Sequence, residues 1–151
     1  MHTLVRRFIK TAIGFLAAGL AIGGWMVVRR ELFGRFPSNY VTSAHTHAIF
    51  VGFVMMMIMG VALWLFPRPD KQDDRYSPGL ITATYWLVSI GTAGRVAGEL
   101  LRLASSAMWV RAIVLLFSFL QILGILLFFY GMWSRIRPLG SRVREEKGER
   151  F

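Results

Sequence analysis

The 151-residue sequence contains no cysteine, three histidines and eight acidic residues. Without cysteine the chain has no disulfide, no iron–sulfur ligand, no thiolate zinc site and no cysteine nucleophile. The 18 lysines and arginines outnumber the acidic residues and give a formal net charge of +10. A nucleic-acid-binding protein would gather such charge on one folded surface. Here the basic residues stand between long apolar blocks, which is typical of a membrane protein.

Apolar residues make up 55% of the chain, above the ~45–50% of soluble domains. Four stretches reach the ~20 apolar residues that a helix needs to span a bilayer, and none has the alternation of a barrel strand. We predict an all-α integral membrane four-helix bundle. Its domain covers residues 1–141, with spans at about 8–28, 44–66, 80–101 and 108–133, followed by a charged cytoplasmic tail at 142–151. The first apolar core exceeds the ~7–15 residues of a signal peptide, which favours an uncleaved span.

The ends of the spans carry recognisable stop and start signals. Arg29 and the two residues after it end the first span, and Pro67 ends the second, since proline disfavours helix for the residue before it. Ser77 followed by Pro78 opens the third span as an N-cap with proline at the first helical position. Pro138 and Gly140 close the fourth.

The positive-inside rule assigns an orientation from the basic residues. Six fall on the side of the first and third loops: Arg29, Arg30, Arg35, Arg95, Arg102 and Arg111. Twelve fall on the side of both termini and the second loop: Arg6, Arg7, Lys10, Arg68, Lys71, Arg75, Arg135, Arg137, Arg142, Arg144, Lys147 and Arg150. We therefore expect both termini in the cytoplasm of a multi-pass protein of a bacterial or archaeal inner membrane.

Small residues recur at helix-packing spacing as Gly19-x-x-x-Gly23 and Gly94-x-x-x-Gly98. Such pairs let two helix backbones approach closely, and packing within the bundle or between protomers explains them equally well. Gln121, in the fourth span, is expected to hydrogen-bond another helix.

His45 and His47 stand at the outer end of the second span and are the candidate ligands. Ionisable residues entering a span are functional candidates by default, although interfacial histidines that bond to water or loop carbonyls explain them too. Two residues apart on a helix, their rings point about 200° apart. They could share a metal only if the helix began after His45. The face of His45 carries Ala48 and Gly52 and leaves more room for a macrocycle, which favours it over His47.

Arg95 falls at the depth of these histidines, ~24 Å along the third span. If the macrocycle beside the histidines is a haem, its two propionates need partners. Arg95 and Arg102 are candidate contacts for them, because guanidinium forks suit carboxylates. The alternative for Arg95 is an interfacial pair with Glu99, four residues on, in which Arg95 snorkels towards water.

The stretch from His45-Thr46-His47-Ala48 through Gly52-Phe53 to Pro67 resembles the second helix of haem–copper oxidase large subunits, above all cbb-type cytochrome oxidases and nitric oxide reductases. In that family a His-Thr pair at this place supplies an axial ligand of low-spin haem b. The resemblance implies this role for His45, with Thr46 beside it. The large subunits have many more helices, which carry the remaining ligands. Since no histidine follows His47 here, this chain is not a complete oxidase or reductase on its own, and whether it is an enzyme stays open.

We therefore expect a membrane protein that binds haem b iron through His45 or His47 and serves electron transport or diatomic-gas binding. The sixth ligand could come from a second protomer in a dimer or from a partner subunit of a respiratory complex, or stay open for a gas. The alternative is a cofactor-free accessory or assembly subunit of a respiratory membrane complex. Copper held by the two histidines and nearby methionines is less favoured.

Overall fold

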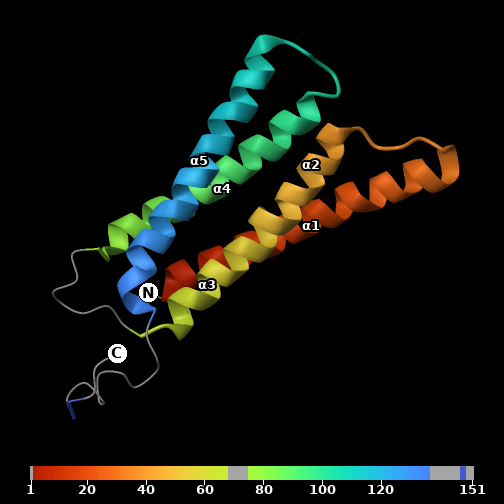
Figure 1. Cartoon of the computed structure of the whole chain (residues 1–151). Helices are drawn as coiled ribbons and strands as arrows, with labels where there is room; N and C mark the ends of the chain where they lie inside the picture. The colour runs from red at the N-terminus through yellow and green to blue at the C-terminus, as the bar shows by residue number, and fades with distance from the viewer. Residues whose placement is uncertain (1, 68–74, 137–146, 149–151) are drawn as a thin grey trace.

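The computed structural model describes residues 2–67, 75–136 and 147–148, and this part of the chain is all-helical. α1 (His2–Phe33) is followed by a second long helix made of α2 (Asn39–His47), η1 (Ala48–Met55) and α3 (Met56–Leu65). α4 (Pro78–Leu101), α5 (Met108–Met132) and the short 3-10 turn η2 (Trp133–Arg135) complete it (Figure 1). The four helices coincide with the four apolar segments expected from the sequence.

Three of these helices are long and apolar enough to cross a membrane: Thr3–Phe33, Asn39–Leu65 and Met108–Arg135. The prediction of four membrane-spanning segments is therefore supported for three of them. α4 is not among the helices that are apolar enough to cross a membrane. The reason lies in its composition, since α4 carries Arg95 and Glu99 as well as several hydroxyl residues. Its residues Thr84, Ser89, Thr92 and Glu99 are buried inside the protein, so their polarity is turned away from the surroundings.

The helix ends confirm two of the four expected signals, those at Pro67 and at Ser77 with Pro78. Ser77 caps α4 by accepting a 2.9 Å hydrogen bond from the Leu80 amide, with Pro78 at the first helical position. α3 ends at Leu65, and the next residue is extended ahead of Pro67. α1 runs past the expected stop at Arg29 and ends before Gly34, whose φ of 60° is a left-handed conformation that suits glycine.

The chain folds as two helical hairpins joined side by side. α1 packs along η1 and α3, while α4 packs along α5, and α4 also contacts α2 and η1 (Figure 1). A hydrophobic core joins all four helices where the start of α1 meets the end of α3; we call this the core end. Its buried residues are Val5, Phe8, Ala12, Met56, Met59, Leu63, Ile81, Tyr85, Val88, Phe128 and Met132. The opposite end, where α2 begins and α4 finishes, carries the buried Glu99 and its polar partners Ser43 and Arg95; we call it the polar end.

Both glycine pairs pack within the chain, which settles a question that the sequence left open. A Cβ added at Gly19 would collide with the side chain of Ile49, and one at Gly23 would come within 2.8 Å of His45 Cε1. Gly94 lies under the ring of Phe117, and Gly98 lies against Val114. Gly19 and Gly23 therefore bring α1 against the second helix, and Gly94 and Gly98 bring α4 against α5.

Arg135 closes the core end with a buried guanidinium. It is 1% exposed and donates from Nε to the carbonyl of Pro67 at 2.8 Å and from Nη2 to the carbonyls of Leu63 and Phe66 at 3.1 Å each. These carbonyls belong to the last turn of α3 and to the two residues after it, where carbonyls lack intrahelical partners and a positive charge is favourable. Arg135 thus ties the end of α5 to the end of α3.

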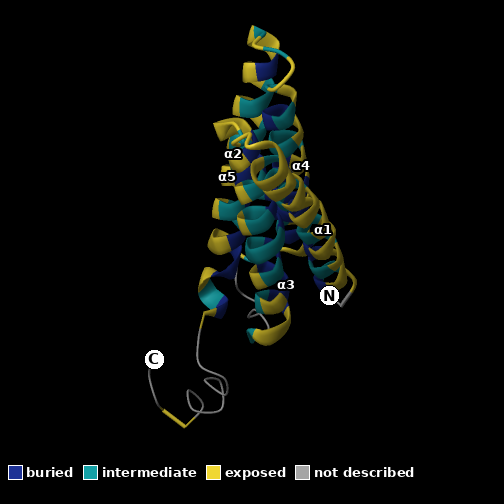
Figure 2. Cartoon of the chain, turned by 90° about the vertical axis from the view of Figure 1, so that its right-hand side faces the viewer, coloured by how far each residue is buried: buried dark blue, intermediate teal, exposed yellow. Residues whose placement is uncertain are grey.

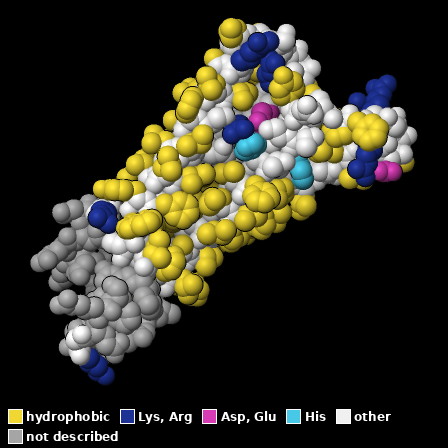
Figure 3. All heavy atoms as spheres, viewed as in Figure 1, with side chains coloured by type: hydrophobic (Ala, Val, Ile, Leu, Met, Phe, Trp, Pro, Cys, Tyr) yellow, Lys and Arg dark blue, Asp and Glu magenta, His cyan; other side chains and the backbone are white. Residues whose placement is uncertain are grey.

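The outer surfaces of the helices are largely apolar. Figure 2 shows buried residues along the inner sides of the helices and exposed residues along their outer sides. Figure 3 shows hydrophobic side chains over the middle of one face, with lysine and arginine gathered mostly towards its ends. Exposed large side chains such as Leu20, Trp64, Trp86, Phe119 and Leu126 fit a surface that faces lipid.

Some expectations fall outside the described residues. These are the loop cations Arg68 and Lys71, the stop at Pro138 and Gly140, and residues 142–146 and 149–151 of the expected tail.

Candidate functional site

His45 lies on the flank of α2 that faces α1. Its Nδ1 is 2.9 Å from the carbonyl oxygen of Gly19, and its ring covers Gly23, where a side chain would collide with it. A carbonyl can only accept, so Nδ1 carries the hydrogen and donates it. In the neutral ring this leaves the lone pair on Nε2, the arrangement that second-shell carbonyls impose on metal-binding histidines.

His47 lies on the opposite flank, towards α4. Its Nδ1 donates to the carbonyl of Ser43 at 2.8 Å and lies 3.8 Å from Oε2 of Glu99. The two rings diverge as the helical spacing predicts. Because the helix begins at Asn39, before both histidines, the condition under which they could share one metal ion is not met.

The second helix changes its winding directly after His47. Ala48–Met55 form a π-helix, which is wider than an α-helix. Segments of this kind are rare and often occur at functional sites. Nothing in the apolar composition of this stretch predicts it. Within it Gly52 is buried against Phe15 of α1.

The room expected on the His45 face is filled by α1. A Cβ at Gly52 would collide with the ring of Phe15, and Ala48, Met56 and Met59 are fully buried. The small residues on this face therefore serve the approach of α1 to the second helix. The argument from free space that favoured His45 over His47 is wrong for this chain.

Glu99 is the centre of a polar cluster that links three helices. Its Oε1 accepts hydrogen bonds from Ser43 Oγ of α2 at 2.7 Å and from Arg95 Nε at 3.2 Å. Arg95 Nη1 reaches Oε1 of Gln121 on α5 at 3.4 Å, and Gln121 Nε2 donates to Thr92 Oγ1 at 3.0 Å. The expected interhelical bond of Gln121 is confirmed, and so is the pairing of Arg95 with Glu99.

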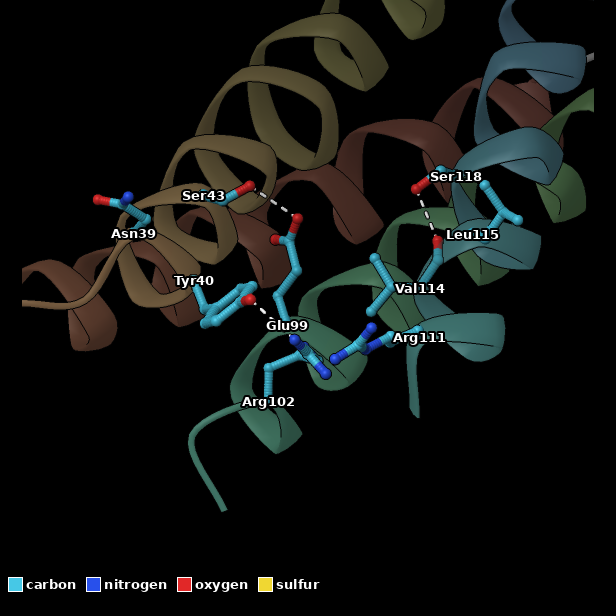
Figure 4. Close-up of a pocket in the computed structure, with 9 residues that line it drawn as sticks. All are labelled: Asn39, Tyr40, Ser43, Glu99, Arg102, Arg111, Val114, Leu115 and Ser118. Atoms are coloured by element: carbon cyan, nitrogen blue, oxygen red, sulfur yellow. Dashed lines mark hydrogen bonds between the residues drawn. The ribbon is translucent and has the colours of Figure 1, made fainter. Parts of the chain in front are cut away.

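A cavity of about 510 Å³ opens beside this cluster at the polar end (Figure 4). It is lined by Asn39, Tyr40, Ser43, Glu99, Arg102, Arg111, Val114, Leu115 and Ser118. Arg102 Nη2 donates to the hydroxyl of Tyr40 at 2.8 Å, and its guanidinium stacks on that ring at 4.8 Å from the centroid. The volume lies within the ~300–1,000 Å³ range of ligand pockets.

The structure thus divides the residues singled out in the sequence. His47, Arg95 and Glu99 come together, and Arg102 lines the adjacent cavity, whereas His45 lies apart against α1. Neither histidine lines the cavity. Ser43, Tyr40 and Arg111 were missed as site residues. The signal for Arg111 was the short 102–107 connection, which folds the start of α5 back beside the end of α4.

Groups of three or more histidine or acidic side chains placed to hold a metal ion are absent from the described residues. A haem would need one axial nitrogen from this chain rather than such a group, and either imidazole offers it. The hydrogen bonds from Nδ1 to backbone carbonyls fix each ring and leave the lone pair of Nε2 for a metal ion. These donor sets fit an axial haem ligand.

Comparison with curated proteins gives a distant relative. The chain is 29% identical over 124 residues to the Cbb3-type cytochrome c oxidase subunit CcoN1 of Stutzerimonas stutzeri. The match supports a haem–copper oxidase-like relationship. It covers 78% of this chain and 25% of CcoN1, so the chain spans about a quarter of the length of that relative. No protein-family model matches the sequence. No solved structure matches it either.

The similarity and the apolar helices together indicate a multi-pass membrane protein that is distantly similar to a cytochrome oxidase subunit. The relationship agrees with the resemblance seen in the His45–Phe53 stretch and extends it over most of the chain.

Proposed function

We propose that this protein binds haem b in the membrane through a histidine of α2 and serves electron transfer or the binding of a diatomic gas. One observation carries the proposal: in both His45 and His47, Nδ1 bonds to a backbone carbonyl and leaves Nε2 for iron. When bound, haem supplies an iron that changes oxidation state or takes a gas at an open axial position. The similarity to a cytochrome oxidase subunit supports this cofactor class.

The arginines are assigned to the propionates as part of the same proposal. Arg102 lines the cavity, and its Nη1 is buried with no hydrogen-bond partner within the described residues, so its N–H groups remain to donate to a carboxylate. Arg95 is held by Glu99 and Gln121 and has the weaker claim. A second protomer or a partner subunit completes the iron coordination, or the sixth position stays open to a gas.

We further propose that all four helices span the inner membrane, with both termini in the cytoplasm. α4 is the helix whose composition argues least for a span. Its buried polar residues are turned towards the other helices, where intramembrane polar groups are tolerated.

An optical spectrum of the protein purified with adequate haem tests the proposal. A Soret band is expected in the wild type, and it should be lost or strongly shifted in His45→Ala or in His47→Ala, whichever removes the ligand. His2→Ala is the matched control, because it removes a histidine from the far end of α1. Imidazole added to the affected variant should restore the band where the fold is intact. A wild type without a Soret band would refute the proposal.

The second candidate is a cofactor-free accessory or assembly subunit of a respiratory complex. It is favoured by the internal pairing of His47, Arg95 and Glu99, which gives these polar groups a structural role without any cofactor. Stoichiometric partner subunits that co-purify with a haem-free protein would support it. Haem without such partners would count against it.

A further inference from the structure

Two buried polar atoms, which belong to residues that line the cavity at the polar end, have no hydrogen-bond partner in the described part of the chain. They are Oε2 of Glu99 and Nη1 of Arg102. Glu99 is 4% exposed, and its other oxygen is satisfied by Ser43 and Arg95. Leaving a buried charged atom unpaired is costly, so native proteins pair such atoms with protein, water or ligand. Oε2 of Glu99 lies 3.8 Å from Nδ1 of His47 but accepts no hydrogen bond, and Nη1 of Arg102 donates none, while both residues line the same cavity.

The charges around the cavity specify what would satisfy these atoms. Figure 4 shows the guanidiniums of Arg102 and Arg111 close to one another, with the Glu99 carboxylate directed towards Ser43. Two converging arginines bind phosphate well, because their forks match its oxygens. A simple anion, however, would meet the repulsion of Glu99. A ligand that carries an anionic group and a nearby N–H donor would pair with the two arginines and with Glu99.

We propose that this cavity binds a zwitterionic phosphate–ammonium headgroup of the ethanolamine phosphate type. The phosphate lies between Arg102 and Arg111, and the ammonium donates to the carboxylate of Glu99, which lines the same cavity. Val114 and Leu115 form an apolar wall, and Leu115 is 59% exposed on α5. Such a wall suits acyl chains, so a phospholipid is the expected source of the headgroup.

This site goes beyond the proposed function and does not rest on haem. The lipid phosphate would contact Arg102, which the proposed function assigns to a haem propionate. When lipid occupies the cavity, haem would therefore be held by the histidines without Arg102. The two proposals fail separately, since haem content is read from the spectrum and lipid binding from the experiment below.

Native mass spectrometry of the full chain in detergent measures the lipid preference. The probes are short-chain phosphatidylethanolamine, phosphatidylcholine and phosphatidylglycerol. Phosphatidylethanolamine should bind about tenfold more tightly than the others, a difference of one charge-assisted hydrogen bond. The quaternary ammonium of phosphatidylcholine has no N–H for Glu99, and phosphatidylglycerol has no ammonium. Equal binding of all three lipids would overturn the proposal.

Two variants and a matched control locate the site. Arg111→Gln should weaken phosphatidylethanolamine binding about tenfold, whereas Arg35→Gln, an exposed arginine of the loop between α1 and α2, should leave it unchanged. Glu99→Gln should abolish the preference for phosphatidylethanolamine over phosphatidylglycerol. Because Arg111 is exposed, its replacement does not threaten the fold, and unchanged binding in Arg111→Gln would contradict the site. Displacement of the lipid by equal concentrations of soluble phosphoethanolamine would assign the same chemistry to a soluble ligand.

Discussion

The hydroxyl of Ser43 donates a 2.7 Å hydrogen bond to Oε1 of Glu99 and so joins α2 to α4 at the polar end. Ser43→Ala removes this bond and should lower the unfolding free energy by about 0.6–1.7 kcal/mol, the range of interhelical bonds measured in membranes. Glu99→Ala should cost more, because it also leaves Arg95 without its carboxylate partner. Unfolding in detergent, followed by circular dichroism, measures both. A larger loss in Ser43→Ala than in Glu99→Ala would contradict the role given to Glu99.

Gly91 lies directly against the backbone of α5. A Cβ at this position would lie 2.7 Å from the backbone nitrogen of Gln121 and 2.9 Å from its Cα. Backbone cannot move aside as a side-chain end can, so Gly91→Ala should destabilise the protein by about 1–3 kcal/mol, the usual cost of overpacking.

Gly24 provides the control for that substitution. Nothing lies within 4 Å of a Cβ added there, so Gly24→Ala should leave thermal stability unchanged or raise it through its higher helix propensity. If both alanine variants melt at the same temperature, the close packing of α4 on α5 is wrong.

The hydrogen bonds of the Arg135 guanidinium predict that lysine cannot replace Arg135 without loss of stability. Three carbonyls at the end of α3 receive its Nε and Nη2 hydrogens, and an ammonium on a flexible stem does not reproduce that planar geometry. Arg135→Lys should lower the melting temperature measurably, whereas Arg7→Lys, at an exposed position of α1, should not. Equal stability of the two variants would show that the fork contributes little to holding α3 and α5 together.

The absence of cysteine makes the orientation directly testable by single-cysteine labelling. With both termini in the cytoplasm, Ser38→Cys, in the loop after α1, should react with a membrane-impermeant maleimide on intact cells. Lys147→Cys should react after the membrane is opened. Reaction of Lys147→Cys on intact cells, with Ser38→Cys protected, would reverse the proposed orientation.

The helices were predictable because apolar length and proline or capping signals act locally. Ser77 and Pro78 define the start of α4 by their own geometry, and the structure confirms it. The end of α1 was placed too early, because the exposed residues after Val28 continue the helix until Gly34. The polarity of α4 was visible in the sequence, but which side its polar residues face depends on its packing against the other helices.

The site was harder to predict than the helices because it depends on which faces meet. The spacing of His45 and His47 predicted that their rings diverge, and they do. The partners of each ring follow from tertiary packing: α1 fills the His45 face, while α4 brings Glu99 to His47. The cavity at Arg111 likewise depends on contacts between helices. The apolar composition of Ala48–Met55 does not predict its π-helical winding.

Haem content per protomer tests the central claim most directly. The amount of haem b in the purified protein, measured as the pyridine haemochrome, is compared between the wild type and a His45→Ala/His47→Ala double variant of equal helicity. We predict at least one haem for every two protomers in the wild type, as a shared haem between protomers requires, and none in the double variant. A haem-free wild type, or a double variant that retains its haem, would contradict the account.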